Sequence, residues 1–170
     1  MKAYVDTGLA LAYIITNDPN HQIAKNVIDS FKNVRFILSD LSILEMTSVL
    51  SRTIDFIKIP FKLVEELKPH EKVISIIAFC IRKLNAEVCS LKIKKIRQTF
   101  PGMIIGLNDL MYDAMQLASE LRLRTLDLLH ITIAKRLNVD AFLTLDREIL
   151  KKADIIERKL GMKVFPSQVP

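Results

Sequence analysis

The stretch Ala3-Tyr4-Val5-Asp6, near the start of the chain, joins a short apolar strand pattern to an acid at its end. A second stretch of this kind, Ala141-Phe142-Leu143-Thr144-Leu145-Asp146, lies near the other end of the chain. In an open parallel sheet, ligands bind outside the carboxyl ends of the strands. If these two strands are neighbours, Asp6 and Asp146 therefore meet at one edge of the sheet.

Strand and helix patterns alternate on both sides of a long middle segment. The spacing of apolar residues predicts, in chain order, a helix over 9–15, a helix over 22–32, a strand over 34–38, a helix over 39–52, a helix over 126–137, a strand over 141–145, a short helix over 147–152 and a strand over 162–165. Parallel strands need crossover connections, which are usually helices. The pattern therefore favours an α/β fold, with a short parallel sheet and helices on both faces.

The middle of the chain differs in character. Residues 60–123 show helical periodicity and no convincing strand, with a break at Phe100-Pro101-Gly102. A length of 170 residues fits one domain. We therefore expect a single domain over residues 1–170, in which residues 55–105 form a helical insertion or elaboration.

Composition excludes several classes of protein. With 50% hydrophobic and 26% charged residues, the chain can bury a core, so neither a disordered nor a fibrous protein is expected. Only 4 Gly are present, too few for a glycine-rich phosphate loop. The charge balance of 25 Lys and Arg against 19 Asp and Glu, a net +6, allows an acidic partner such as nucleic acid without proving one.

Cysteine usage and hydropathy bear on location. Cys80 and Cys89 stand in a helical pattern with no secretory signal before them, so free thiols in a reducing cytoplasm are expected. The most apolar run, residues 73–81, is much shorter than the roughly 20 residues that a membrane helix needs. No membrane association is therefore predicted.

Two further acids can join Asp6 and Asp146 at the same edge. Glu45 lies inside the predicted helix after the second strand, and Asp127 begins the helix that leads into the third. Each has a simpler explanation, since Asp127 and Asp146 could cap helices and Glu45 could belong to a capping box with Ser42. Asp6 is harder to explain in this way, because a carboxylate at the end of a buried strand is costly unless it is paired, hydrogen-bonded or bound to metal.

These four acids and their neighbours resemble the PIN-domain nucleases, and most closely the VapC-type toxin ribonucleases. The resemblance depends on Val5-Asp6-Thr7, Glu45, Asn20-His21 with Ala24, Asp127 followed by Leu128-Leu129-His130, and Thr144-Leu145-Asp146. It is good over residues 1–53 and 108–165 and weak over 55–105. It implies a PIN-like three-layer fold and an endoribonuclease that cuts single-stranded RNA with water, leaving a 5′-phosphate.

The resemblance also implies partners. Members of this family are commonly homodimers and are paired with an antitoxin protein, so both partners are expected here besides RNA. One position departs from the family pattern, which has Ser or Asn two residues after the first Asp, where this chain has Gly8. Thr7 or Thr144 could supply the missing hydrogen bond. Gly8 could also mean weak catalysis.

The residues by themselves indicate the same chemistry. Four converging carboxylates repel one another and need a cation, and an all-oxygen ligand set suits Mg²⁺ or Mn²⁺ better than zinc. Such an ion can activate water and neutralise charge on a phosphodiester. A cationic surface could bind the RNA backbone, and its residues are Lys92, Lys94, Lys95 and Arg97, with Arg122 and Arg124. An equal explanation is that these residues form a solvated helix face. His130 is predicted to be a packing residue.

Three other functions share part of this pattern. Asp6-Thr7-Gly8 is also the signature of aspartic proteases, but those enzymes are built almost wholly of strands. A haloacid-dehalogenase-like phosphatase would need a second Asp at the position of Gly8. The alternative that stays open is a PIN-like fold with little or no catalysis that serves as an RNA-binding or protein-interaction module.

Overall fold

The five strands of the main sheet run parallel in the order β3-β2-β1-β6-β7. In the computed structural model, which describes residues 1–60, 66–100 and 103–166, these strands are β1 (Lys2–Val5), β2 (Arg35–Ser39), β3 (Glu87–Cys89), β6 (Ala141–Leu143) and β7 (Lys163–Phe165). Strand β1 pairs with β6 so that Val5 lies opposite Leu143. The two strands that lead into Asp6 and Asp146 are thus neighbours, which is the condition under which the sequence analysis expected these acids to meet.

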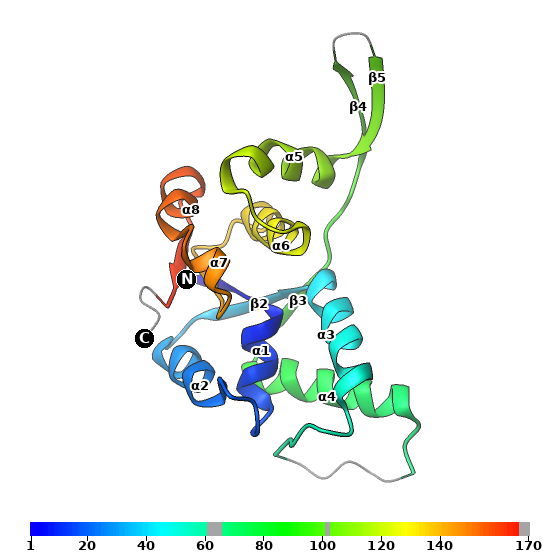
Figure 1. Ribbon diagram of the computed structural model, residues 1–170, viewed down its shortest axis with the longest axis vertical. Coiled ribbons are helices and arrows are strands. Elements are labelled where there is room, and N and C mark those ends of the chain that lie inside the picture. Colours follow the sequence, from blue (N-terminus) through cyan, green and yellow to red (C-terminus); the bar gives the residue numbers. More distant parts are fainter. Residues whose placement is uncertain (61–65, 101–102, 167–170) are drawn as a thin grey trace.

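Helices cover both faces of this sheet (Figure 1). Their bounds are α1 (Thr7–Ile14), α2 (His21–Ser30), α3 (Asp40–Thr53), α4 (Pro69–Leu84), α5 (Asp109–Leu121), α6 (Thr125–Arg136), α7 (Arg147–Leu150) and α8 (Ala153–Leu160). Helices α1 to α4 lie on one face, and α5, α6 and α8 lie on the other. The predicted α/β fold, a three-layer PIN-like arrangement, is confirmed.

The sheet separates two hydrophobic cores, because successive side chains of a strand point to opposite faces. Val5 packs into the core shared with α1 to α4, whereas Tyr4 packs into the core shared with α5, α6 and α8. Phe142 of β6 stacks on Tyr4, with ring centroids 5.3 Å apart. Both cores meet at β1, so the strand that carries Asp6 is held from both sides.

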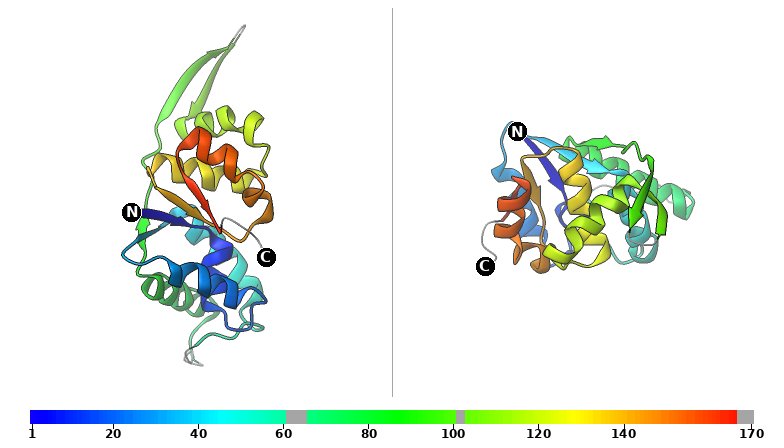
Figure 2. Two further views of the ribbon diagram at one scale, coloured as in Figure 1. Left: turned by 90° about the vertical axis from the view of Figure 1, so that its left-hand side faces the viewer. Right: turned by 90° about the horizontal axis from the view of Figure 1, so that it is seen from above.

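The middle segment corrects one prediction. Helix α4 has the expected helical character, but residues 87–108 contain three strands where helix was expected. Besides β3, they form a two-stranded antiparallel sheet of β4 (Lys95–Phe100) and β5 (Met103–Asn108), which projects from the body as a hairpin (Figures 1 and 2). Of the predicted break, Phe100 ends β4, while Pro101 and Gly102 lie outside the described residues.

The physical reason is that these strands are defined by pairing and not by their own pattern. β3 has three residues and is placed by its ladder to β2, in which Leu38 lies opposite Val88. The hairpin lies outside the two cores, and Ile104 of β5 is 70% exposed, so these strands do not need the alternation that marks a half-buried strand.

Two further observations concern the cysteines and the hydropathy of the helices. Cys80 and Cys89 are both free thiols, as expected. Within the described ranges, no helix combines the length and the apolar character that crossing a membrane requires.

Candidate metal-binding active site

A pocket of about 560 Å³ opens beside the carboxyl ends of β1 and β6. Its lining includes all four predicted acids, Asp6, Glu45, Asp127 and Asp146, together with Gly8, Arg124 and His130. The four carboxylates come from the β1–α1 junction, α3, α6 and the β6–α7 connection. The fold therefore brings to one pocket the acids that the sequence pattern singled out.

Asp6 is buried at the point where β1 passes into α1. Its Oδ1 accepts a hydrogen bond from the Thr7 amide at 2.8 Å, which caps α1, and its Oδ2 accepts one from the Thr144 hydroxyl at 2.6 Å. Burial raises the pKa of the Asp6 carboxyl, and His130 and the Thr144 hydrogen bond oppose that shift. A carboxylate placed here calls for positive charge nearby.

Thr144 joins the ends of the two central strands. Besides donating to Asp6, its hydroxyl accepts a hydrogen bond from the Asp146 amide at 2.9 Å. Asp146 in turn uses Oδ1 to accept from the Glu148 amide at 2.7 Å, so it caps α7. Asp146 thus both caps a helix and lines the pocket.

The capping explanations fail for the other two acids. Arg124 occupies the N-cap position of α6 without a capping hydrogen bond from its side chain, and Asp127 lies inside the first turn of the helix. The capping box at the start of α3 is formed by Ser39 and Ser42, so Glu45 lies inside that helix. Neither carboxylate is needed to begin its helix.

Glu45 is held by a buried polar chain. His130 Nε2 lies 2.9 Å from Glu45 Oε2, and His130 Nδ1 lies 2.7 Å from the Tyr4 hydroxyl, which also contacts Ser39 Oγ at 2.7 Å. Because a carboxylate only accepts, Nε2 donates to Glu45. This hydrogen bond lowers the pKa of Glu45, although partial burial opposes the shift. His130 is buried, as a packing residue would be, but it also positions a site carboxylate.

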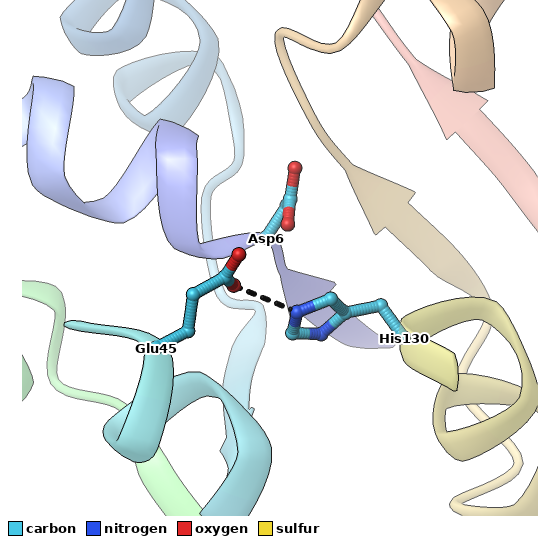
Figure 3. A group of neighbouring side chains, drawn as sticks. All are labelled: Asp6, Glu45 and His130. Carbon is cyan, nitrogen blue, oxygen red and sulfur yellow. Dashed lines mark hydrogen bonds and ion pairs between the residues drawn. The ribbon is translucent and has the colours of Figure 1, made fainter. Parts of the chain in front are cut away.

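Asp6, Glu45 and His130 form the inner half of the site. One ligand atom of each lies within 4.8 Å of the others, and the three side chains converge from β1, α3 and α6 (Figure 3). The outer half consists of Asp127, Asp146 and Arg124, which contacts both carboxylates. Burial raises the pKa of Asp127, and the hydrogen bond from Arg124 opposes that shift.

These residues fit a divalent cation that prefers oxygen. Both nitrogens of His130 already have hydrogen-bond partners. The atoms of the pocket that could bind a metal ion are therefore the carboxylate oxygens. The buried Thr7 hydroxyl has no partner in hydrogen-bond geometry within the described residues, although its proximity also lowers the pKa of Glu45. Carboxylates with a spare hydroxyl suit hard cations such as Mg²⁺ or Mn²⁺ better than zinc, which favours His and Cys ligands.

The predicted RNA-contacting cations lie elsewhere. Lys92 and Lys94 precede β4, and Lys95 and Arg97 belong to it; all four are exposed and none lines the pocket. The solvated helix face proposed as their alternative explanation is wrong, since they lie on the hairpin and the segment leading to it.

Arg124 is the contact that sequence reasoning missed. It was expected only as part of a cationic surface, whereas it pairs with two of the predicted site acids. The signal available was its position three residues before Asp127, a spacing that brings side chains together on a helix.

Comparison with known proteins supports the fold. The sequence matches no family model and no curated protein. Among solved structures, a chain of VapBC2 from Rickettsia felis, crystallised with a DNA fragment from its promoter, has a TM-score of 0.56 at 12% identity, covering 97% of this chain and 99% of its own. The Mycobacterium tuberculosis toxin VapC20, which cleaves the sarcin-ricin loop, has a TM-score of 0.54 at 15% identity, covering 85% and 90%. At these identities the likeness concerns the fold.

Proposed function

We propose that this protein is a metal-dependent endoribonuclease that hydrolyses phosphodiesters of single-stranded RNA, and that it is the toxin of a toxin–antitoxin pair. The observation that carries the proposal is the gathering of Asp6, Glu45, Asp127 and Asp146 around one pocket. The likeness of the fold to VapC toxins supports the choice of RNA as substrate.

In this proposal the four acids hold Mg²⁺ or Mn²⁺, which supplies activation of a water and neutralisation of phosphoryl charge. The chain's other residues keep the acids in place. Thr144 fixes Asp6 and the backbone of Asp146, and His130, itself held by Tyr4, fixes Glu45. Thr7 supports the inner half through its amide, which donates to Asp6, and through its hydroxyl, whose proximity lowers the pKa of Glu45.

The hairpin supplies the wider RNA contacts. Between Glu87 and Asp109 the sequence contains no acid, so Lys92, Lys94, Lys95 and Arg97 form an uninterrupted cationic stretch. Such a stretch suits the phosphate backbone of a single strand.

Two protein partners belong to the same proposal. An antitoxin and a second copy of the chain both need apolar contact surface, and the exposed apolar side chains on α3, α5 and α6 provide it, namely Leu44, Met111, Met115 and Leu126. We place the complex in the cytoplasm. Light scattering of the purified chain should give a mass of about twice 19.4 kDa. A monomer at all concentrations would contradict the homodimer.

The nuclease proposal is tested with labelled single-stranded RNA. Cleavage should require added Mg²⁺ or Mn²⁺, should stop with EDTA, and should fall at least 100-fold in Asp6→Asn and Asp146→Asn, on the order of the loss seen when electrostatic catalysis is removed. Asp154→Asn, which changes an exposed carboxylate of α8 that does not line the pocket, is the matched control.

A second function is favoured by one observation. Gly8 lines the pocket at the position where the VapC-type family that the chain resembles usually carries Ser or Asn, and a binding module without efficient catalysis would lack that side chain. Under this alternative the protein retains RNA intact in the presence of metal. Retention with no cleavage under any metal would replace the nuclease proposal by the binding module.

A further inference from the structure

Arg124 bridges the two acids of the outer half of the site. Its Nε donates to Asp127 Oδ2 at 3.0 Å, and its second guanidinium nitrogen donates to Asp146 Oδ2 at 2.5 Å. The guanidinium therefore lies between two of the four carboxylates that the proposed function assigns to the metal. A divalent ion and a guanidinium that share the same oxygens repel each other.

Arg124 contacts the Asp146 oxygen that the Glu148 amide does not use. The Oδ1 atom of this carboxylate accepts from the Glu148 amide, which caps α7, and Oδ2 accepts from Arg124. A divalent ion bound at Oδ2 would lie beside the guanidinium, and the repulsion between the two cations favours loss of the Arg124 contact.

The two halves of the site differ in how easily their internal partners can move. His130 is 2% exposed and is bonded at both nitrogens, so it stays with Glu45. The Arg124 side chain is 70% exposed, and within the described residues it forms ion pairs with the two acids alone. The two carboxylates are 15% and 25% exposed, but an ion pair whose cationic partner is as exposed as Arg124 is readily exchanged.

Resting on the proposed function, we propose that Arg124 is a counter-ion of Asp127 and Asp146 that the divalent cation displaces, and that the freed guanidinium then binds a phosphate of the RNA. The same side chain thus opposes the metal before loading and assists the RNA after it. Guanidinium is suited to both tasks, because its planar fork matches carboxylate and phosphate alike.

The first test measures Mn²⁺ binding to metal-free protein by titration calorimetry. Arg124→Gln should bind Mn²⁺ roughly threefold to tenfold more tightly than the wild type, because two competing ion pairs are gone. Arg147→Gln is the matched control, because this substitution removes the same charge. Arg147 directly follows Asp146 and is exposed, but it does not line the pocket. Equal Mn²⁺ affinity in Arg124→Gln and the wild type would overturn the displacement.

The second test uses the unmodified protein and follows arginine Nε–H signals by NMR during a Mg²⁺ titration. The Arg124 signal, assigned by its loss in Arg124→Gln, should shift with the same midpoint as Mg²⁺ binding. Arg136 is an internal reference, because it bridges Asp109 and Asp113 away from the pocket in a similar way. An Arg124 signal that stays in place while Mg²⁺ binds would overturn the proposal.

The third test addresses the phosphate. With a labelled single-stranded oligoribonucleotide, Ca²⁺ as the loading ion and the RNA checked for integrity, loading should raise the RNA affinity of the wild type. Arg124→Gln should show a gain at least threefold smaller, whereas in EDTA the two proteins should bind RNA alike. An equal gain in both proteins would overturn the binding of phosphate by Arg124.

Failure of this inference is distinguishable from failure of the proposed function. If neither the wild type nor Arg124→Gln binds a divalent ion, the metal-dependent nuclease and the displacement both fall. If both bind it equally and Arg124 does not move, the nuclease proposal stands and the role of Arg124 is refuted.

Discussion

The Asp6 carboxylate illustrates how one residue can weaken the fold that positions it. It is 9% exposed, and burial raises its pKa. A raised carboxyl pKa means that the folded protein holds this proton to higher pH than the unfolded chain does. The stabilising contribution is therefore complete below the ordinary aspartate pKa of about 3.9 and is lost as pH rises through the raised value. Above that value the charged group destabilises the metal-free protein.

We therefore expect Asp6→Asn to stabilise the metal-free protein at pH 7.5. Each kcal/mol gained should raise the melting temperature by roughly 2–4 °C in a chain of this length. The gain should vanish near pH 3, where the wild-type carboxyl is protonated, as thermal unfolding followed by circular dichroism in EDTA would show. Asp154→Asn should leave the melting temperature unchanged both at pH 7.5 and near pH 3. A lower melting temperature for Asp6→Asn at pH 7.5 would mean that the hydrogen bonds from Thr7 and Thr144 outweigh the cost of burial.

Gly8 makes a second prediction at the scale of one residue. A Cβ atom added there meets no atom within 4 Å, so a larger side chain fits. Gly8→Ser should therefore fold normally and gain about 0.5 kcal/mol of stability from helix propensity. Its hydroxyl would face the pocket that Gly8 lines, and we expect faster metal-dependent RNA cleavage. Gly161→Ser is the contrasting control, because Gly161 has φ +67°, where a side chain is strained. Unchanged cleavage in Gly8→Ser would show that the missing side chain does not limit catalysis.

The elements differ in how far the sequence could predict them. β1, β2, β6 and β7 were predicted because each contains a short apolar run beside a predicted helix, and a buried parallel strand has that composition. β3 has three residues, with Glu87 and Val88 exposed, so its composition carries no strand signal. The β4–β5 hairpin depends on pairing between its own strands outside the core. The periodicity of apolar residues predicts only those strands that are buried in a core, so it could not predict β3 or the hairpin.

The hairpin makes a prediction of its own as an element. A variant with Lys92, Lys94, Lys95 and Arg97 all changed to Gln should bind single-stranded RNA more weakly. The slope of log affinity against log salt should fall by about 0.7 for each phosphate that the variant no longer neutralises. Fluorescence anisotropy at several salt concentrations measures both the RNA affinity and its dependence on salt. The control removes four exposed charges elsewhere, at Lys32, Lys135, Arg158 and Lys163. Equal weakening in both variants would mean that net charge alone attracts RNA and that the hairpin has no particular role.

At the scale of the whole molecule, the sheet order explains which part of the site could be predicted. Acids that follow neighbouring parallel strands lie at one edge of the sheet, so the strand pattern predicted the meeting of Asp6 and Asp146 on the condition that β1 and β6 are neighbours, which the structure shows. The contact between His130 and Glu45 joins residues 85 positions apart on different helices, and no spacing rule gives their distance. The pairing of Arg124 with Asp146 depends on the same unpredictable packing of α6 against the end of β6. The sequence thus predicted the acids but not the hydrogen-bond and ion-pair partners that hold them.

Metal binding should be visible in the stability of the whole chain, because a ligand that binds only the folded state stabilises it by mass action. At a concentration 100 times its dissociation constant, Mn²⁺ should add about 2.7 kcal/mol, which corresponds to a rise of about 5–10 °C in melting temperature at this chain length. EDTA should reverse the rise. Asp6→Asn should begin above the wild type without metal and gain little from it, so that the order of the two proteins inverts as Mn²⁺ is added. The same rise in both proteins would place the ion away from Asp6 and refute the proposed metal site, whatever the RNA assays give.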